Sequence, residues 1–154
     1  MKTKTTLVVL ALSLALAAVC LAASPQMGTW KLNEGKSKFS PGAAKNKTVV
    51  YQAAGASVKV IVDGIDGAGK ATHNEWTGKF DGKDYAVTGD ANFDMRAYKQ
   101  VDDHTLDMTL KKGGKVVGTG KIVVATDGKS RTVTTTATDA KGKKSTNTAV
   151  YAKK

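Results

Sequence analysis

The sequence predicts an all-β fold: an up-and-down antiparallel β-barrel of about 8–10 strands. Stretches rich in Val, Thr and Tyr alternate with short segments of Gly, Asp, Asn and Lys, which is typical of strands joined by tight turns. Several stretches alternate polar and apolar residues, as in Val58, Val60 and Val62, so each strand has one face on a core. A β-sandwich is the alternative, but hairpin-length connections favour a closed meander that leaves no exposed edge.

The strands are separated by turn signals. Asp63-Gly64, Asp81-Gly82, Gly113-Gly114 and Asp127-Gly128 supply the positive φ angles that hairpin turns require. The segment 34–46 contains Pro41 and Gly42 and is expected to form an irregular loop. The ten predicted strands span 27–33, 47–53, 57–63, 72–80, 83–88, 94–101, 104–111, 115–125, 129–138 and 145–152.

The first residues have the pattern of a secretory signal peptide. Lys2 and Lys4 precede an apolar run over 7–19, and small residues follow at Ala22 and Ala23. We therefore expect a signal peptide at 1–23 and a single barrel domain at 24–154, located in the periplasm or secreted. An uncleaved anchor is the alternative, although the run is shorter than the about 20 residues of a membrane span. The mature chain has no second apolar run of that length, so we expect no transmembrane segment in it.

Cys20 is the only cysteine and lies within the expected signal peptide. Lipid attachment there is disfavoured, because Val19 occupies a position where lipoprotein signals have a small residue. Removal of Cys20 leaves a mature chain with no thiol, which excludes disulfides and thiolate metal sites.

The mature chain is strongly basic. Without Lys2 and Lys4, 22 basic residues stand against 13 acidic residues, a net charge of +9. Such a balance favours anionic partners, and export argues against nucleic acid. The alternative is that the positive charge only keeps the domain soluble, because the lysines are spread along the chain. We expect a monomer.

The stretch DGIDGAGKAT matches the G-x-x-x-x-G-K spacing of a phosphate-binding loop through Gly64, Gly69 and Lys70. Ala71 stands where that motif needs Ser or Thr, and the following residues have the pattern of a strand rather than a helix. The glycines therefore predict a hairpin turn, not a nucleotide site.

The segment MGTWKL at 27–32 resembles the G-x-W start of the barrel in lipocalins and fatty-acid-binding proteins, and the chain ends in TAVYAKK. Over 27–153 the chain also resembles small exported bacterial proteins of unknown function, through KSKFSPG, KFDGKDYAVTG, KKGGKVVGTGK and DGKSRTVTTTATDAKGK. The resemblance implies a lipocalin-like, calycin-type barrel.

The resemblance also implies roles for single residues. Trp30, after Gly28, would plug one end of the barrel, and Arg131 from a late strand would stack on it. Fatty-acid-binding proteins have an arginine two residues before the final tyrosine, but this chain has Ala149 before Tyr151. Binding of a fatty acid by that mechanism is thereby disfavoured. The segment 34–46 is too short for their two-helix lid.

A barrel of this size can hold a small ligand in an apolar interior with a few polar groups. In the strand 131–138 either face is small or partly polar, which favours a cavity. A filled interior is the alternative. The residues expected by parity to line the barrel are Trp76, Phe80, Tyr85, Val87, Met95, Leu106 and Met108.

Arg96 and Tyr98 share one face of the strand 94–101. If that face points inward, Arg96 is a candidate to hold an anionic ligand head. The opposite face carries Met95, Ala97 and Val101, which favours an outward Arg96.

No pattern indicates catalysis, a metal or a cofactor. His73 and Glu75 share a strand face, but no H-x-x-x-H spacing accompanies them. Asp102 and Asp103 are better explained as a turn. The expected function is therefore non-catalytic binding of a small apolar or amphipathic ligand by an exported lipocalin-like barrel. The alternative is a basic envelope-interaction module that docks on anionic polymer or lipid surfaces.

Overall fold

The structure is a computed structural model that describes residues 24–139 and 141–154. The expected signal peptide at 1–23 lies outside these residues. The same is true of its cleavage near Ala22 or Ala23 and of lipid attachment at Cys20. Within them, no helix is long and apolar enough to cross a membrane.

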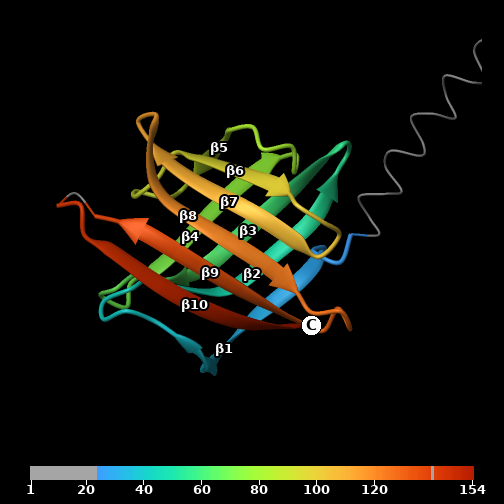
Figure 1. The fold of residues 1–154 in the computed structure, drawn as a ribbon, viewed down its shortest axis with the longest axis horizontal. Helices are drawn as coiled ribbons and strands as arrows, with labels where there is room; N and C mark the ends of the chain where they lie inside the picture. Colours follow the sequence, from blue (N-terminus) through green and yellow to red (C-terminus); the bar gives the residue numbers. More distant parts are fainter. Residues whose placement is uncertain (1–23, 140) are drawn as a thin grey trace, which may run out of the picture.

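Ten antiparallel strands form one closed barrel, in which each strand pairs with its neighbours in the chain and β1 pairs with β10 (Figure 1). The closure confirms the predicted up-and-down barrel and excludes the β-sandwich. The strands are β1 (Gly28–Lys38), β2 (Lys45–Ala54), β3 (Ser57–Ile65), β4 (Ala71–Gly78), β5 (Tyr85–Thr88), β6 (Met95–Gln100), β7 (Thr105–Lys112), β8 (Lys115–Val124), β9 (Ser130–Thr138) and β10 (Lys144–Lys153).

The predicted loop at 34–46 is wrong at both ends, because β1 continues to Lys38 and β2 begins at Lys45, and the loop with Pro41 and Gly42 spans only 39–44. β1 pairs with β2 only as far as Lys31 and Thr48, and beyond a register irregularity it follows β10. The polar end of β1 bonds there to β10, as the amide of Val150 donates to Ser37 Oγ at 2.9 Å. The pairing comes from a strand more than a hundred residues away, so local composition gave no sign of it.

The connection between β3 and β4 confirms that the phosphate-loop spacing marks a hairpin. Asp66 Oδ1 accepts hydrogen bonds from the amides of Ala68 and Lys70, both at 2.9 Å. Gly69 adopts a φ of +83°, which a side chain would disfavour.

The core is the barrel interior, as the period-two alternation requires. Register places Tyr51 beside Val60 and Val60 beside Trp76 on the inward faces of β2, β3 and β4. Buried apolar residues line most strands: Trp30, Val49, Tyr51, Val58, Val60, Val62, Trp76, Val87, Tyr98, Leu106, Met108, Ile122, Val124, Ala149 and Tyr151.

The two ends of the barrel differ. At the end where β1 begins, which we call the plugged end, Trp30 Nε1 donates to the carbonyl oxygen of Gln26 at 2.9 Å. Gln26 Nε2 in turn donates to the carbonyl oxygen of His104 at 3.0 Å, so the segment before β1 is tied across this end. The opposite end, which we call the mouth, carries the connections at 39–44, 66–70, 89–94, 113–114 and 139–143.

Candidate functional site

Arg131 lies at the plugged end within a cage of aromatic rings. Its guanidinium carbon is 4.7 Å from the ring centroid of Trp30, 4.8 Å from that of Tyr51 and 5.1 Å from that of Tyr151. The side chain is 2% exposed, and its Nε and Nη1 have no hydrogen-bond partner among the described residues. Ring faces attract a desolvated cation by about 2 kcal/mol, so the aromatic cage partly offsets the burial of this charge.

Trp30 is fully buried and also faces a second cation. Lys153 Nζ lies 5.1 Å from its ring centroid and donates to the carbonyl oxygen of Pro25 at 3.1 Å. Gly28 has a φ of +110°, and a Cβ there would lie 3.0 Å from Lys153 Cε. Glycine at this position therefore allows the chain end to close over Trp30.

Several predicted lining residues meet in one aromatic cluster beside β4. The rings of Trp76 and Tyr98 pack edge to face at 4.9 Å, and those of Phe80 and Tyr98 at 5.8 Å. Tyr85 packs edge to face on Trp76 at 5.7 Å. These rings fill their part of the interior, and Val87, Leu106 and Met108 are buried with them in the core.

Arg96 points into the barrel, so the favoured outward placement is wrong. The side chain is 4% exposed, whereas the adjacent Met95 is 37% exposed and lies outside, so its assignment to the lining is wrong too. The face of β6 that turns inward is set by Tyr98, whose ring completes the aromatic cluster, and by a polar partner for Arg96 on β4. Hydrophobicity of the opposite face did not decide the orientation, because a guanidinium can pack against aromatic rings.

The guanidinium of Arg96 has one hydrogen-bond partner. Its Nη2 donates to Asn74 Oδ1 at 3.1 Å, while Nε and Nη1 are buried without an acceptor. Its central carbon lies 5.2 Å from the ring centroid of Phe93 and 5.8 Å from that of Tyr98. Asn74 Nδ2 donates to Asp90 Oδ2 at 3.2 Å, so Asp90 reaches Arg96 only through Asn74.

Three tyrosine hydroxyls accompany the two arginines. The hydroxyl oxygens of Tyr51 and Tyr98 lie 3.3 Å apart, and Tyr151 donates to the carbonyl oxygen of Asn46 at 3.0 Å. Burial raises the pKa of Tyr98, although the charges of Arg96 and Arg131 oppose the shift, and burial raises the pKa of Tyr151 to about 12. Both phenols are therefore neutral at physiological pH and offer no counter-charge to the arginines.

Part of the inner wall is open to solvent. On β9 the inward face carries Arg131, Val133, Thr135 and Ala137, and exposure rises along it: Arg131 is buried, Val133 and Thr135 are half-buried, and Ala137 is exposed. On the neighbouring strand β8, Gly118 pairs with Ala137 and Gly120 with Thr135, and Met108 fills the space at Gly120, where a Cβ would lie 2.8 Å from Met108 Cε. Toward the mouth, the inward face of β9 therefore carries small and partly polar side chains.

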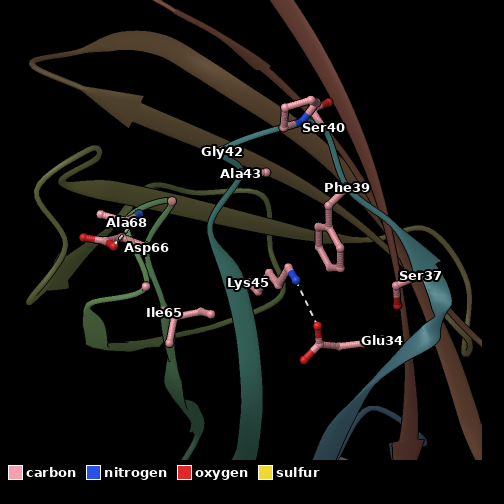
Figure 2. Close-up of a pocket in the computed structure, with 13 residues that line it drawn as sticks. Glu34, Ser37, Phe39, Ser40, Gly42, Ala43, Lys45, Ile65, Asp66 and Ala68 are labelled. Carbon is pink, nitrogen blue, oxygen red and sulfur yellow. Dashed lines mark hydrogen bonds and ion pairs between the residues drawn. The ribbon is translucent and has the colours of Figure 1, made fainter.

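A pocket of about 630 Å³ lies where β1 and β2 separate near the mouth (Figure 2). The ring of Phe39 and the side chains of Glu34 and Lys45 line one side of it. The turn at 66–69 lines the other, and Gly67 approaches Gly42 so closely that a Cβ would lie 2.1 Å from the Gly42 carbonyl oxygen.

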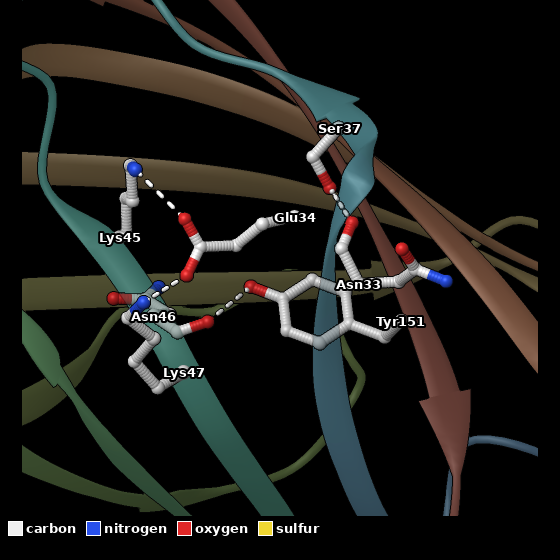
Figure 3. Close-up of polar contacts among 7 residues, drawn as sticks. All are labelled: Asn33, Glu34, Ser37, Lys45, Asn46, Lys47 and Tyr151. Atoms are coloured by element: carbon white, nitrogen blue, oxygen red, sulfur yellow. Dashed lines mark hydrogen bonds and ion pairs between the residues drawn. The ribbon is translucent and has the colours of Figure 1, made fainter.

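Glu34 bridges the gap between the two strands (Figure 3). Its carboxylate accepts hydrogen bonds from Lys45, at 2.9 Å, and from Lys47. These bonds, first that of Lys47, lower the pKa of Glu34 to about 2. Tyr151 lies nearby and holds Asn46 of β2 from inside the barrel. Polar contacts thus replace the missing backbone ladder between β1 and β2.

The positive charge of the described residues is concentrated at the mouth. The mouth segments 36–45, 65–71, 88–95, 111–115 and 138–144 hold ten lysines and four aspartates, and the segments 24–29, 53–58, 78–85, 99–105, 124–130 and 152–154 at the plugged end hold six and five. Two of the ten mouth lysines, Lys45 and Lys111, are paired with Glu34 and Asp84, which lie outside the mouth segments. All four mouth aspartates accept backbone hydrogen bonds within turns or from a neighbouring turn. The mouth lysines are Lys36, Lys38, Lys45, Lys70, Lys111, Lys112, Lys115, Lys141, Lys143 and Lys144.

His73 and Glu75 lie on the outer face of β4. His73 Nδ1 is 2.7 Å from Asp63 Oδ1, and Nε2 is 3.5 Å from Glu75 Oε1. The hydrogen bond with Asp63 is the main cause of a raised pKa of His73. No group of three or more potential metal ligands occurs within residues 24–139 and 141–154.

Sequence reasoning missed Asn74, Phe93, Tyr51 and Glu34 as site residues. Asn74 lies two positions before Trp76 and therefore shares its inward face, a signal that the sequence already contained. Phe93 lies in a connection, and Glu34 lies in the segment that was predicted as a loop. For these two, only the pairing of distant strands reveals what they contact.

Comparison with known proteins gives no family. No protein-family model and no curated protein sequence matches the chain. One solved structure, described as EF1p2_mFAP2b bound to DFHBI, is similar with a TM-score of 0.48 and 11% sequence identity. The similarity covers 87% of this chain and 98% of that chain.

Proposed function

We propose that this protein is an exported, lipocalin-like barrel that binds a small amphipathic molecule in its interior without transforming it. The observation that carries the proposal is the gradient of burial along the inner face of β9. Arg131 is 2% exposed at the plugged end, and Ala137 near the mouth is exposed although it faces inward. The end of this face that lies at the mouth is therefore accessible from solvent.

Further features support the proposal. Leu110 and Val133 add half-buried apolar surface to the same part of the interior. Apolar walls with a few polar groups are the usual composition of a ligand site. The N-terminal signal pattern supports export.

The proposal is tested by filling the open half of the interior. In Ala137→Phe the new ring points inward, and in the matched control Ala152→Phe it points outward from β10. We expect dodecanol, an amphipathic probe, to bind the wild type and the control. It should bind Ala137→Phe at least about ten-fold more weakly, because the new ring displaces part of the apolar tail, whose burial contributes more than about 1 kcal/mol to binding. Equal binding to all three proteins, or to none, would contradict the proposal.

A second candidate function rests on the mouth lysines. Docking on anionic lipid or polymer surfaces would use this lysine-rich end, and its strength would fall steeply with salt. Co-sedimentation with vesicles of anionic lipid at low and high ionic strength tests it. Absence of binding at low salt would exclude this function.

A further inference from the structure

We propose that the pocket between β1 and β2 binds a neutral sugar, which packs on the ring of Phe39 and bonds through its hydroxyl groups to Glu34 and Lys45. This inference goes beyond the proposed function, because it concerns the wall of the barrel and not its interior. None of the residues that line this pocket belongs to the buried core. Its volume of about 630 Å³ lies in the range of small-molecule sites.

Much of the pocket wall is backbone with little side chain over it. Small residues from the connection 39–44 and the turn 66–69 supply this part of the lining: Gly42, Ala43, Gly67, Ala68 and Gly69. The two segments approach so closely that a Cβ on Gly67 would lie 2.1 Å from the carbonyl oxygen of Gly42. Such a wall offers peptide groups to a ligand rather than apolar side chains, which suits a ligand rich in hydroxyl groups.

Phe39 gives the pocket one aromatic surface. The residue is half-buried against the core, and Figure 2 shows its ring pointing into the pocket toward Lys45 and Glu34. A pyranose has an apolar face of C–H groups that matches a six-membered ring in size and packs on it. Lys45 Nζ lies 5.6 Å from the ring centroid, near the limit of about 6 Å for a cation–π contact, so this flexible side chain can yield the ring face to a ligand.

Glu34 and Lys45 present an acceptor beside a donor. Glu34 Oε2 accepts from Lys45 Nζ at 2.9 Å, and Oε1 accepts from Lys47 (Figure 3). A carboxylate has about four acceptor sites and an ammonium has three N–H donors, so these bonds leave capacity on both groups. The side chains of Glu34 and Lys45 are 48% and 33% exposed, which keeps them within reach of a ligand. Two neighbouring sugar hydroxyls match this pair, because one can donate to Glu34 while the other accepts from Lys45.

The charges of the pocket compensate one another, which favours a neutral ligand over an ion. Glu34 is paired with Lys45 and Lys47, and Asp66 Oδ1 accepts from two backbone amides of its own turn at 2.9 Å. A charged ligand would have to displace one of these partners. Hydroxyl groups bond to the same atoms without breaking an ion pair.

The segment that carries Phe39 is fixed by polar contacts with β10. The amide of Ser40 donates to Asn147 Oδ1 at 2.7 Å, and Ser40 Oγ donates to the carbonyl oxygen of Thr146 at 3.3 Å. These bonds hold the ring of Phe39 at the pocket in the absence of a ligand. Binding then requires little ordering of the protein, which lowers its cost.

The test compares methyl β-glucoside with sorbitol and with glucuronate. Isotope-labelled protein expressed from the full-length sequence is titrated with each ligand, and its amide signals are followed by NMR. We expect methyl β-glucoside to shift the amides of Gly42, Gly67 and Ala68 in a saturable manner. It should bind about five-fold more tightly than sorbitol, which has the hydroxyl groups but no ring to pack on Phe39. Glucuronate, which adds a carboxylate to the ring, should bind no more tightly than methyl β-glucoside.

Variants assign the two contacts. Phe39→Leu keeps an apolar side chain against the core but removes the ring, so it should weaken binding of methyl β-glucoside about five-fold, whereas Phe39→Tyr should retain it. Glu34→Gln should weaken binding about three- to ten-fold through the loss of a charge-assisted hydrogen bond. Its matched control is Glu75→Gln, because Glu75 is a similar exposed carboxylate, paired with Lys59 at 2.9 Å outside the pocket. Thermal unfolding checks that each variant is folded.

Several outcomes would overturn the inference. They are the absence of saturable shifts in the wild type, shifts confined to residues outside the pocket, and equal binding of sorbitol and methyl β-glucoside. Tighter binding of glucuronate would show that the pocket selects an anion and would refute the neutral class. Equal losses in Glu34→Gln and Glu75→Gln would refute the contact assigned to Glu34. The interior site is tested separately by dodecanol, so each proposal can fail without the other.

Discussion

The guanidinium carbon of Arg131 lies 4.7 Å from the ring centroid of Trp30, and the indole of Trp30 donates to Gln26 at 2.9 Å. The pair joins β1 to β9, about a hundred residues apart in the chain, and closes the plugged end. Trp30→Ala is expected to lower the free energy of unfolding by about 3–5 kcal/mol, because it opens a cavity in the packed half of the barrel. Urea denaturation measures this loss.

Arg131→Met is the comparison for that prediction. It removes contacts with three rings but also removes a buried charge, and such replacements are often neutral or stabilising. We expect a loss of less than about 1.5 kcal/mol, well below that of Trp30→Ala. A loss as large as that of Trp30→Ala would show that the cation itself holds the plugged end together.

Gly78 is required by the aromatic cluster. A Cβ there would lie 2.5 Å from Tyr85 Cγ and 2.6 Å from Trp76 Cζ2, and rigid rings cannot yield as a flexible chain end can. Gly78→Ala should destabilise the barrel by about 1–3 kcal/mol, measured by thermal unfolding. Gly118→Ala is the control, since its nearest neighbours would lie at 3.4 Å, an ordinary contact distance. A smaller loss in Gly78→Ala than in Gly118→Ala would contradict the role of the cluster.

Glu34 should titrate far below an ordinary glutamate. Lys47 and Lys45 lower its pKa from 4.5 to about 2 in the folded protein. A lowered pKa contributes stability that is present above about 4.5 and is lost as the pH falls through about 2. Carboxyl-detected NMR of Glu34 should give the low midpoint, and Glu34→Gln should lack this part of the acid dependence. Lys47→Met is expected to raise the midpoint more than Lys45→Met does.

His73 should show the opposite linkage. The hydrogen bond with Asp63 raises its pKa above 6.5 in the folded protein. The associated stability is fully present below about 6.5 and is lost as the pH rises through the raised pKa. In Asp63→Asn the NMR titration of His73 should move back toward 6.5, and in Glu75→Gln it should move less. A larger shift in Glu75→Gln would contradict the order of the two contacts.

The sequence by itself was sufficient for the architecture, since all ten strands lie within a few residues of their predicted ranges except at the end of β1. Alternation and turn residues are local properties, and the hairpins of an up-and-down barrel connect neighbours in the chain. Asp66, Gly69 and Lys70 therefore revealed a turn without any knowledge of the remaining structure.

Only the tertiary structure decided which face of β6 turns inward and what Glu34 contacts. Alternation along β6 favoured the face of Met95 as the inward one, and the inward placement of Arg96 instead depends on Asn74 and Phe93, which belong to other segments. The end of β1 is a strand because β10 supplies its partners. Both outcomes depend on contacts between residues far apart in the chain, and a local pattern does not encode which distant groups will satisfy a buried charge or an unpaired strand.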